Sequence, residues 1–330
     1  MSALAIAAFA AETGRHLVDR PRDAQFARFC RGFDEPAYRR RLSALGVRWI
    51  DRDGGDFPPL LHAIHDPPVG VFLRGAGGPE LLRARSVAVV GARGCTSYGA
   101  HVARMLGREL ASAGVVVVSG LARGVDGEVH RGVLEAAGAT VAVLGCGIDR
   151  DYPAAHSELA RRICERGLIV SEYGPGVEPA PWRFPARNRI IAGLAAVTVV
   201  VEARERSGAL ITADLALEEG RDVLAVPGEI TGTLSMGTNG LLKLGATPLT
   251  CVGDVLELLG VEPPTSAPVA VGSPAADVLA RLREAPAAAD ELARTTALEA
   301  SALAAALTEL ELAGLVAQGD GVYRTVMPVR

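Results

Sequence analysis

The chain of 330 residues contains only one lysine, Lys243, and few aromatic residues, 4% of the total. Its five cysteines are scattered and include no CxxC pair, which is typical of reduced thiols in a cytoplasmic protein. No apolar run reaches the roughly 18 residues of a membrane span, and no basic residues precede the apolar start of the chain. His62 and His65 have no Cys or His neighbours that would complete a metal site. We therefore expect no membrane span, no signal peptide and no bound metal.

Acidic residues are missing from particular stretches, although the formal net charge of the whole chain is −4. Residues 81–108 contain five arginines and no acid. Residues 15–48 contain nine arginines against four acids, a net charge of +5. The total argues against a generally basic surface, so the basic stretches predict local sites for anions.

The middle of the chain alternates short β-branched runs with helical stretches, and each run is followed by glycine, proline or another turn residue. The runs are SVAVV (86–90), VVVVS (115–119), TVAVL (140–144), LIVS (168–171), VTVVV (197–201) and DVLAV (222–226). Continuous apolar strands joined by crossover helices predict an α/β fold with a mostly parallel sheet covered by helices on both faces. Ligands of such sheets bind at the carboxyl ends of the strands.

The composition divides the chain into four parts. Residues 1–70 are predicted to be a short helical segment and a connector, and residues 71–260 the α/β domain. Residues 261–273 form a Pro-rich linker. Residues 274–330 are predicted to contain three helices and a hairpin with an Asp-Gly turn, which together make a winged helix.

The sequence lacks the motifs of three common kinds of nucleotide-binding or catalytic site. The first turn, GARGCTSYG, lacks the GxGxxG of dinucleotide-binding folds, and the second strand does not end in an acid. There is no GxxxxGK[ST] phosphate loop and no GxSxG nucleophile elbow. We therefore expect no cofactor and no catalytic nucleophile.

Several loops instead combine arginine with glycine or a hydroxyl group at predicted strand ends. They contain Arg93 and Thr96, then Gly120 and Arg123, and later Ser207 and Gly208. Thr96 and Ser207 also suit the N-cap of the following helix. Several such loops at one edge of a sheet favour a phosphate-rich ligand.

The stretch WRFPARNRIIAGL (182–194) predicts a helix that begins near Pro185 and carries Arg187 and Arg189 in its first turn. Helix N-termini carry partial positive charge and favour acids by roughly 0.3–1 kcal/mol per group. No Asp or Glu occurs from residue 179 to 201. The arginines therefore predict that an anion binds at this helix end.

Read in order, these stretches resemble the DNA processing protein A family (DprA, also called Smf). The resemblance covers roughly residues 46–250 and depends on a collinear series of motifs. They are GARGCTSYG (91–99), SGLARGVDGEVH (119–130), SEYGPG (171–176), FPARNRIIAGL (184–194), SGALITA (207–213), PG (227–228) and GTNGLLKLGA (237–246).

The resemblance implies an extended Rossmann fold that binds single-stranded DNA, forms a homodimer and helps load RecA recombinase during natural transformation. It assigns Arg93 and Thr96 to the family's first phosphate loop, and Ser207 and Gly208 to its SG element. Gly120 and Arg123 lie in the SGLARG stretch. The RNR element is Arg187, Asn188 and Arg189, of which Arg189 can also point inward to an acid. The basic residues 15–48 are compatible with a supporting DNA contact.

Two other functions remain as alternatives. A nucleotide phosphoribohydrolase would need a glutamate after its PGGxGT motif, and PGEITGTLSMG lacks both the second glycine and that acid. A transcription regulator would use the winged helix to read duplex DNA. However, residues 273–330 contain five arginines against eight acids, and the third helix has no base. We therefore expect a DNA-binding protein that is not an enzyme, with a winged helix that contacts protein.

Overall fold

In the computed structural model, which describes residues 2–14, 24–262 and 272–325, a nine-stranded sheet forms the centre of the protein. The strand order is β1-β2-β6-β5-β4-β3-β7-β8-β9, and every pairing from β6 to β9 is parallel. The strands are β1 (Val47–Asp51), β2 (Gly70–Arg74), β3 (Ser86–Val90), β4 (Val116–Ser119), β5 (Thr140–Leu144), β6 (Leu168–Ser171), β7 (Val197–Val200), β8 (Asp222–Ala225) and β9 (Thr247–Pro248).

The six predicted strands are confirmed as β3 to β8, with ends that differ by at most one residue. Their side chains alternate between two buried cores. Val87 and Val89 of β3 face one core, and Ala88 and Val90 face the other. This is why runs of valine with no polar alternation become strands that are covered on both faces.

Helices cover both faces, as predicted. One core contains residues of α8 (Arg183–Leu194) and α9 (Gly208–Glu218), and the opposite core contains residues of α5 (Ser97–Ser112), α6 (Val125–Glu135) and α11 (Val252–Leu259). The remaining helices of this part are α4 (Pro59–His62), η1 (Pro79–Arg83), η2 (Ala154–His156), α7 (Ser157–Arg166) and α10 (Met236–Lys243).

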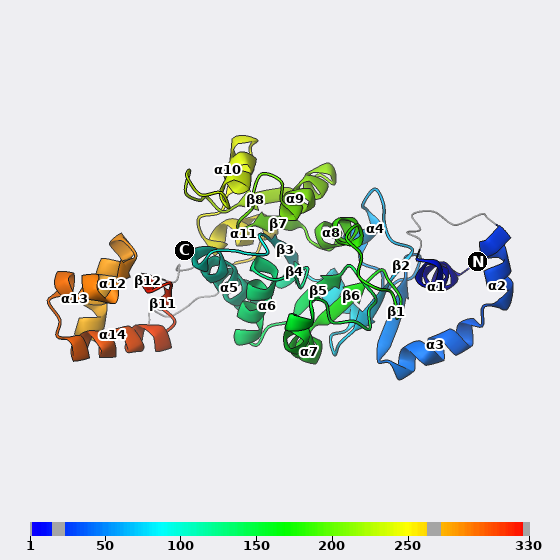
Figure 1. Cartoon of the computed structure of the whole chain (residues 1–330), viewed down its shortest axis with the longest axis horizontal. Helices are drawn as coiled ribbons and strands as arrows, with labels where there is room; N and C mark the ends of the chain where they lie inside the picture. Colours follow the sequence, from blue (N-terminus) through cyan, green and yellow to red (C-terminus); the bar gives the residue numbers. More distant parts are fainter. Residues whose placement is uncertain (1, 15–23, 263–271, 326–330) are drawn as a thin grey trace.

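The N-terminal segment is helical, as predicted, but it also adds an edge to the sheet. Its helices are α1 (Ala3–Thr13), α2 (Ala24–Gly32) and α3 (Glu35–Ala44). Strand β1 lies within the stretch predicted to be a connector, and it pairs antiparallel with β2, which pairs antiparallel with β6. Figure 1 shows α1, α2 and α3 beyond this antiparallel edge.

The C-terminal residues form the predicted winged helix. Its elements are α12 (Ser273–Glu284), β10 (Ala287–Ala288), α13 (Ala289–Thr296), α14 (Ala300–Leu312), β11 (Val316–Gly319) and β12 (Val322–Thr325). Asp320 and Gly321 both have positive φ, 53° and 76°, the backbone geometry that selects an Asp-Gly hairpin turn. Strand β11 contacts α5 of the central domain, and Figure 1 shows the winged helix at the opposite end of the molecule from α2.

The winged helix has a hydrophobic core of its own, formed by residues of α12, α13 and α14. Of the predicted linker at 261–273, residues 263–271 lie outside the described part of the chain. We propose the predicted domain division on the basis of this separate core.

Candidate nucleic-acid interface

The predicted arginine and hydroxyl loops meet at the carboxyl ends of β3, β4 and β7. They enclose a pocket of about 220 Å³, here called the arginine pocket. Its lining includes Arg93, Arg187, Asn188, Ser207 and Gly208, five of the nine residues predicted to bind an anion. The parallel sheet explains the meeting, because all these strands end at the same edge.

A second pocket of about 410 Å³, the aromatic pocket, adjoins the arginine pocket and shares Arg93, Phe184 and Arg187 with it. Gly120 and Arg123, also predicted site residues, line this second pocket. Thr96 and Arg189 belong to neither lining.

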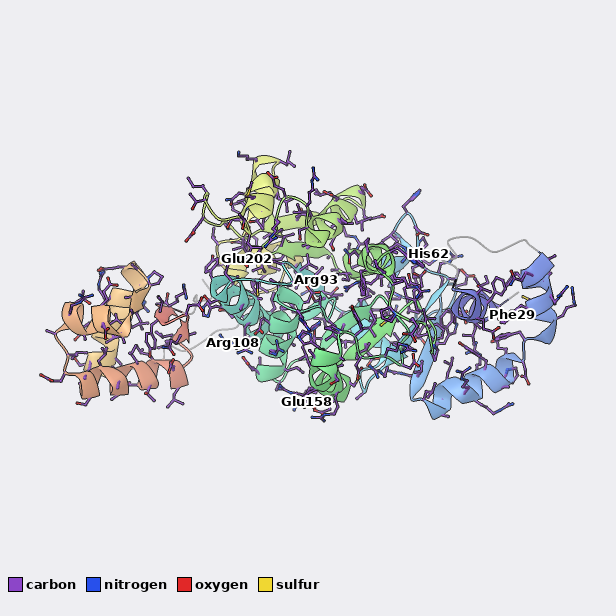
Figure 2. All side chains as sticks on the ribbon, viewed as in Figure 1. Phe29, His62, Arg93, Arg108, Glu158 and Glu202 are labelled. Atoms are coloured by element: carbon purple, nitrogen blue, oxygen red, sulfur yellow. The ribbon has the colours of Figure 1, made fainter. Side chains whose placement is uncertain are left out.

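Arg93 is an exposed cation at the mouth of both pockets. It lies in the loop between β3 and α5, and its guanidinium carbon is 5.4 Å from the centre of the Phe184 ring. Among the described residues it has no carboxylate within salt-bridge distance, and Figure 2 labels it at this edge of the sheet. A guanidinium with no acid partner can bind a phosphate without first breaking an ion pair.

Thr96 caps α5. Its hydroxyl accepts a hydrogen bond from Gly99 N at 3.1 Å and donates to the Glu202 carboxylate at 2.6 Å. Thr96 N donates to the same carboxylate at 2.9 Å. Glu202, which lies two residues after β7 and is only 5% exposed, therefore supplies the negative charge at this helix N-terminus. The hydroxyl already serves the cap, so Thr96 positions the Arg93 loop.

Arg187 is almost completely buried, with 5% of its surface exposed. Its Nη1 donates to the carbonyl of Val143 at 2.9 Å, and its Nε is buried with no hydrogen-bond partner among the described residues. A Cβ at Gly120 would overlap the guanidinium, so Gly120 makes room for this arginine. Helix α8 begins at Arg183, two residues before the predicted start.

Asp126, a residue of α6 that was not among the predicted site residues, acts on Arg187 through its charge, although the two side chains form no salt bridge within 4.0 Å. Asp126 is 6% exposed and lines the arginine pocket. Burial raises the pKa of the Asp126 carboxyl, and the nearby Arg187 charge opposes this increase. Burial likewise lowers the pKa of Arg187, and Asp126 opposes that decrease. The fold therefore brings a carboxylate near Arg187, which the acid-free stretch around residue 187 did not predict, and anion binding by Arg187 stays a prediction.

Asn188 connects α8 to the start of α9. Its Nδ2 donates to the carbonyl of Gly208 at 3.1 Å, while the Ser207 hydroxyl caps α9 by accepting from Ala209 N at 3.3 Å. No atom lies within 4 Å of a Cβ built on Gly208. The N-terminus of α9 is therefore an open, positively polarised end at the arginine pocket.

Arg189 points away from both pockets. It donates to Asp66 at 2.9 Å and to Glu172 at 2.6 Å, and 10% of its side chain is exposed. The prediction that it can point inward to an acid is confirmed. Its two carboxylate partners make it an unsuitable phosphate ligand, because binding would break both contacts.

Two aromatic residues complete the site, and neither was among the predicted site residues. Phe184 lies in both linings and stacks on Tyr152, with ring centres 5.3 Å apart and planes 28° apart. The available signal was the place of Phe184 in FPARNR, directly before Pro185. Stacking of bases on aromatic rings is common in single-strand binding and is worth about 1–3 kcal/mol per base.

Comparison with known proteins supports the resemblance found in the sequence. The family model for DNA recombination-mediator protein A matches residues 48–260, more than half of the chain. The chain belongs to this family. The DprA winged helix domain model matches residues 254–321.

The relatives include proteins from distant bacteria. The putative DNA processing protein DprA of Mycobacterium tuberculosis is 40% identical over 304 residues, covering 86% of this chain and 78% of that protein. The X-ray structure of DNA processing protein A from Streptococcus pneumoniae is 38% identical, with a TM-score of 0.66, covering 77% of this chain and 91% of that chain. A structure of DNA processing protein A from Helicobacter pylori, described for its single-stranded DNA binding mode, is 30% identical. Its TM-score is 0.58, and the match covers 64% of this chain and 95% of that chain.

Membrane spans and metal sites can also be assessed in the folded chain. Within the described ranges, no helix is both long and apolar enough to span a bilayer. Across residues 2–14, 24–262 and 272–325, no three His, Cys, Asp or Glu side chains are grouped so that they could hold a metal ion.

Proposed function

We propose that this protein binds single-stranded DNA at the carboxyl edge of its sheet. The observation that supports this most directly is the combination of Arg93, the open N-terminus of α9 and the Phe184–Tyr152 stack around two adjoining pockets. Arginine and helix N–H groups suit phosphates, and the stacked rings suit bases of any sequence. The Helicobacter pylori relative, described as binding single-stranded DNA, supports the same function.

The nine predicted contacts divide into three roles in this proposal. Arg93, Arg123, Ser207 and Gly208 face the pockets and contact the DNA backbone. The loops and α8 are held in place by Thr96, Gly120, Asn188 and Arg189. The buried Arg187 adds positive electrostatic potential to the pocket that it lines.

The test is a comparison of Arg93→Gln with Arg162→Gln, which removes an exposed arginine of α7, in binding a labelled homopolymer strand. If Arg93 makes a charge-assisted phosphate contact worth about 1.5–3 kcal/mol, its loss weakens binding roughly 10- to 150-fold. The Arg162 control should bind like the unchanged protein. Equal affinities for the two variants would contradict the assignment of the site.

The place of this activity in the cell follows from family membership. We propose that the protein acts in the cytoplasm, protects incoming DNA and loads RecA recombinase during natural transformation. The test is a strand-exchange assay with RecA on DNA coated by single-strand binding protein. Exchange should start faster when this protein is added, and Arg93→Gln should reduce that gain.

A homodimer is also part of the proposal. Two apolar residues near α10 are strongly exposed, Ile230 by 94% and Leu244 by 86%, and Met236 is exposed by 45%. Singly exposed apolar side chains are common on protein surfaces, so the homodimer is proposed from the family resemblance and these residues are candidates for its contact. Light scattering should give twice the chain mass, 2 × 34.2 kDa.

We propose no catalytic role, and we assign the winged helix to a protein contact. Its third helix, α14, carries Glu309 and Glu311 and no basic residue. An acidic recognition helix would repel the phosphates of duplex DNA.

A further inference from the structure

The helices α2 and α3 present exposed arginines without acid partners. Arg28, Arg31, Arg40 and Arg41 are all exposed, and in the described part of the chain none lies within salt-bridge distance of a carboxylate. Arg39 differs from them, because it is paired with Glu35 at 2.8 Å. In a chain with a net charge of −4, four free cations on neighbouring helices form a local basic surface.

Between α1, α2 and α3 lies an open groove of about 720 Å³ that combines aromatic rings with these arginines. Phe29 and Phe33 are stacked in its lining, with ring centres 5.3 Å apart, and Tyr38 follows at 5.5 Å from Phe33. Arg28 and Arg41 also line the groove. Aromatic rings beside cations are the usual components of a surface that binds single-stranded nucleic acid.

Two acids, Glu12 and Asp34, also line this groove, and they differ in how much of its positive charge they offset. The Asp34 carboxylate caps α3 by accepting a hydrogen bond from Ala37 N at 2.9 Å. Its charge is thereby partly balanced by the helix dipole. Glu12 is exposed at the end of α1.

One side of the groove lies near the carboxyl end of β6, at the edge of the sheet that carries the proposed DNA site. A Cβ at Gly174, in the turn after β6, would lie 3.0 Å from the Tyr38 hydroxyl, so α3 reaches the carboxyl end of β6. The side chain of Arg183, at the start of α8, donates to the carbonyl of Gly14 at the end of α1. Strands β3 and β6 are three positions apart in the sheet, a span of roughly 14–15 Å. Figure 2 labels Phe29 on this side of the sheet, beyond β1, with Arg93 nearer the centre.

We propose that the surface of α2 and α3 is a second binding surface for single-stranded DNA, which holds the strand after it leaves the pockets around Phe184. The inference depends on the proposed function and extends it to a longer strand. Contacts there are to phosphates through arginine and to bases through the stacked rings, so they carry no sequence information.

The test compares two triple variants that lose the same charge. Arg28→Gln, Arg40→Gln and Arg41→Gln alter the α2–α3 surface. The control combines Arg162→Gln, Arg283→Gln and Arg294→Gln, which are exposed arginines of α7 and the winged helix. Each protein is titrated with a short oligonucleotide of about 4 nucleotides and a long one of about 30. These lengths lie at the lower end of and well above the roughly 4–16 nucleotides that one OB-fold domain binds.

On the long oligonucleotide, the α2–α3 variant should bind about tenfold or more weakly than the control. Its log–log salt slope should be smaller by about 2, from roughly 0.7 for each of the three lost phosphate contacts. On the short oligonucleotide the two variants should bind equally.

Equal binding of the long oligonucleotide by both variants would overturn this inference and leave the basic surface to a protein partner. A loss of the same size on the short oligonucleotide would also overturn it, because the arginines would then act on the pocket from a distance. Failure of the unchanged protein to bind either oligonucleotide would instead contradict the proposed function.

Discussion

Replacing Arg187 by methionine tests how the floor of the arginine pocket is held together. The change removes the charge and keeps most of the side-chain volume. Arg187 is 5% exposed and Asp126 is 6% exposed, so the lost guanidinium leaves a carboxylate with little access to water. The change also removes the donor of the hydrogen bond from Arg187 Nη1 to the Val143 carbonyl, 2.9 Å long, and a buried polar group left without its partner typically costs about 1–3 kcal/mol. The free energy of unfolding at neutral pH should fall by about that amount, and the melting temperature by roughly 2–12 °C.

The pH dependence of this loss follows from Asp126. Burial already raises the pKa of its carboxyl above the unfolded value, and without Arg187 that pKa rises further. A group whose folded pKa is raised contributes stability below its unfolded pKa, about 3.9 for Asp, and loses it as pH rises through the folded pKa. The stability difference between Arg187→Met and the unchanged protein should therefore be small near pH 4 and grow toward neutral pH.

Thermal unfolding followed by circular dichroism at several pH values measures this difference. The double variant Arg187→Met/Asp126→Asn is the control, since it leaves no stranded charge and should recover part of the stability. The reasoning is refuted if Arg187→Met melts at the same temperature as the unchanged protein at pH 7 to 8. It is equally refuted if the double variant is no more stable than the single one.

Three further outcomes are expected. Arg189→Met should lower the melting temperature, because Glu172 and Asp66 lose their cationic partner, but the folded variant should bind single-stranded DNA as tightly as the unchanged protein. A large loss of affinity in a fully folded variant would show that Arg189 belongs to the DNA site. Deleting residues 268–330 should leave affinity within a few-fold, because α14 is acidic, and a loss as large as that of Arg93→Gln would place the winged helix in the site. Purified protein should turn over neither nucleotides nor DNA, and metal-dependent cleavage abolished by a single pocket substitution would contradict this.

The sequence predicted the parallel sheet well because each of its strands can be recognised from its own residues. Runs such as TVAVL (140–144) are apolar on both faces, and they end in the glycines where the chain turns. The antiparallel strands β1 and β2 were missed. Their sequences, VRWID and GVFLR, include charged residues and stand next to loops rich in proline and glycine, and their pairing depends on the edge that β6 offers.

The sequence predicted most of the loops that meet at the candidate site, but not the contacts that its side chains make. The partners that decide a role lie far away in the sequence: Thr96 bonds to Glu202, and Arg187 faces Asp126. The absence of acids from the sequence around residue 187 says nothing about a carboxylate that α6 brings near it in the fold. Phe184 was overlooked because its stacking partner, Tyr152, comes from a separate loop.

The central claim is that single-stranded DNA lies in the pockets between Arg93, Phe184 and α9. A crystal structure of the protein bound to a short homopolymer oligonucleotide tests it most directly. The account predicts a phosphate within hydrogen-bond distance of Arg93 or of the backbone N–H groups at the start of α9, and a base stacked on Phe184. An oligonucleotide bound away from this edge, with both pockets empty of it, would contradict the account.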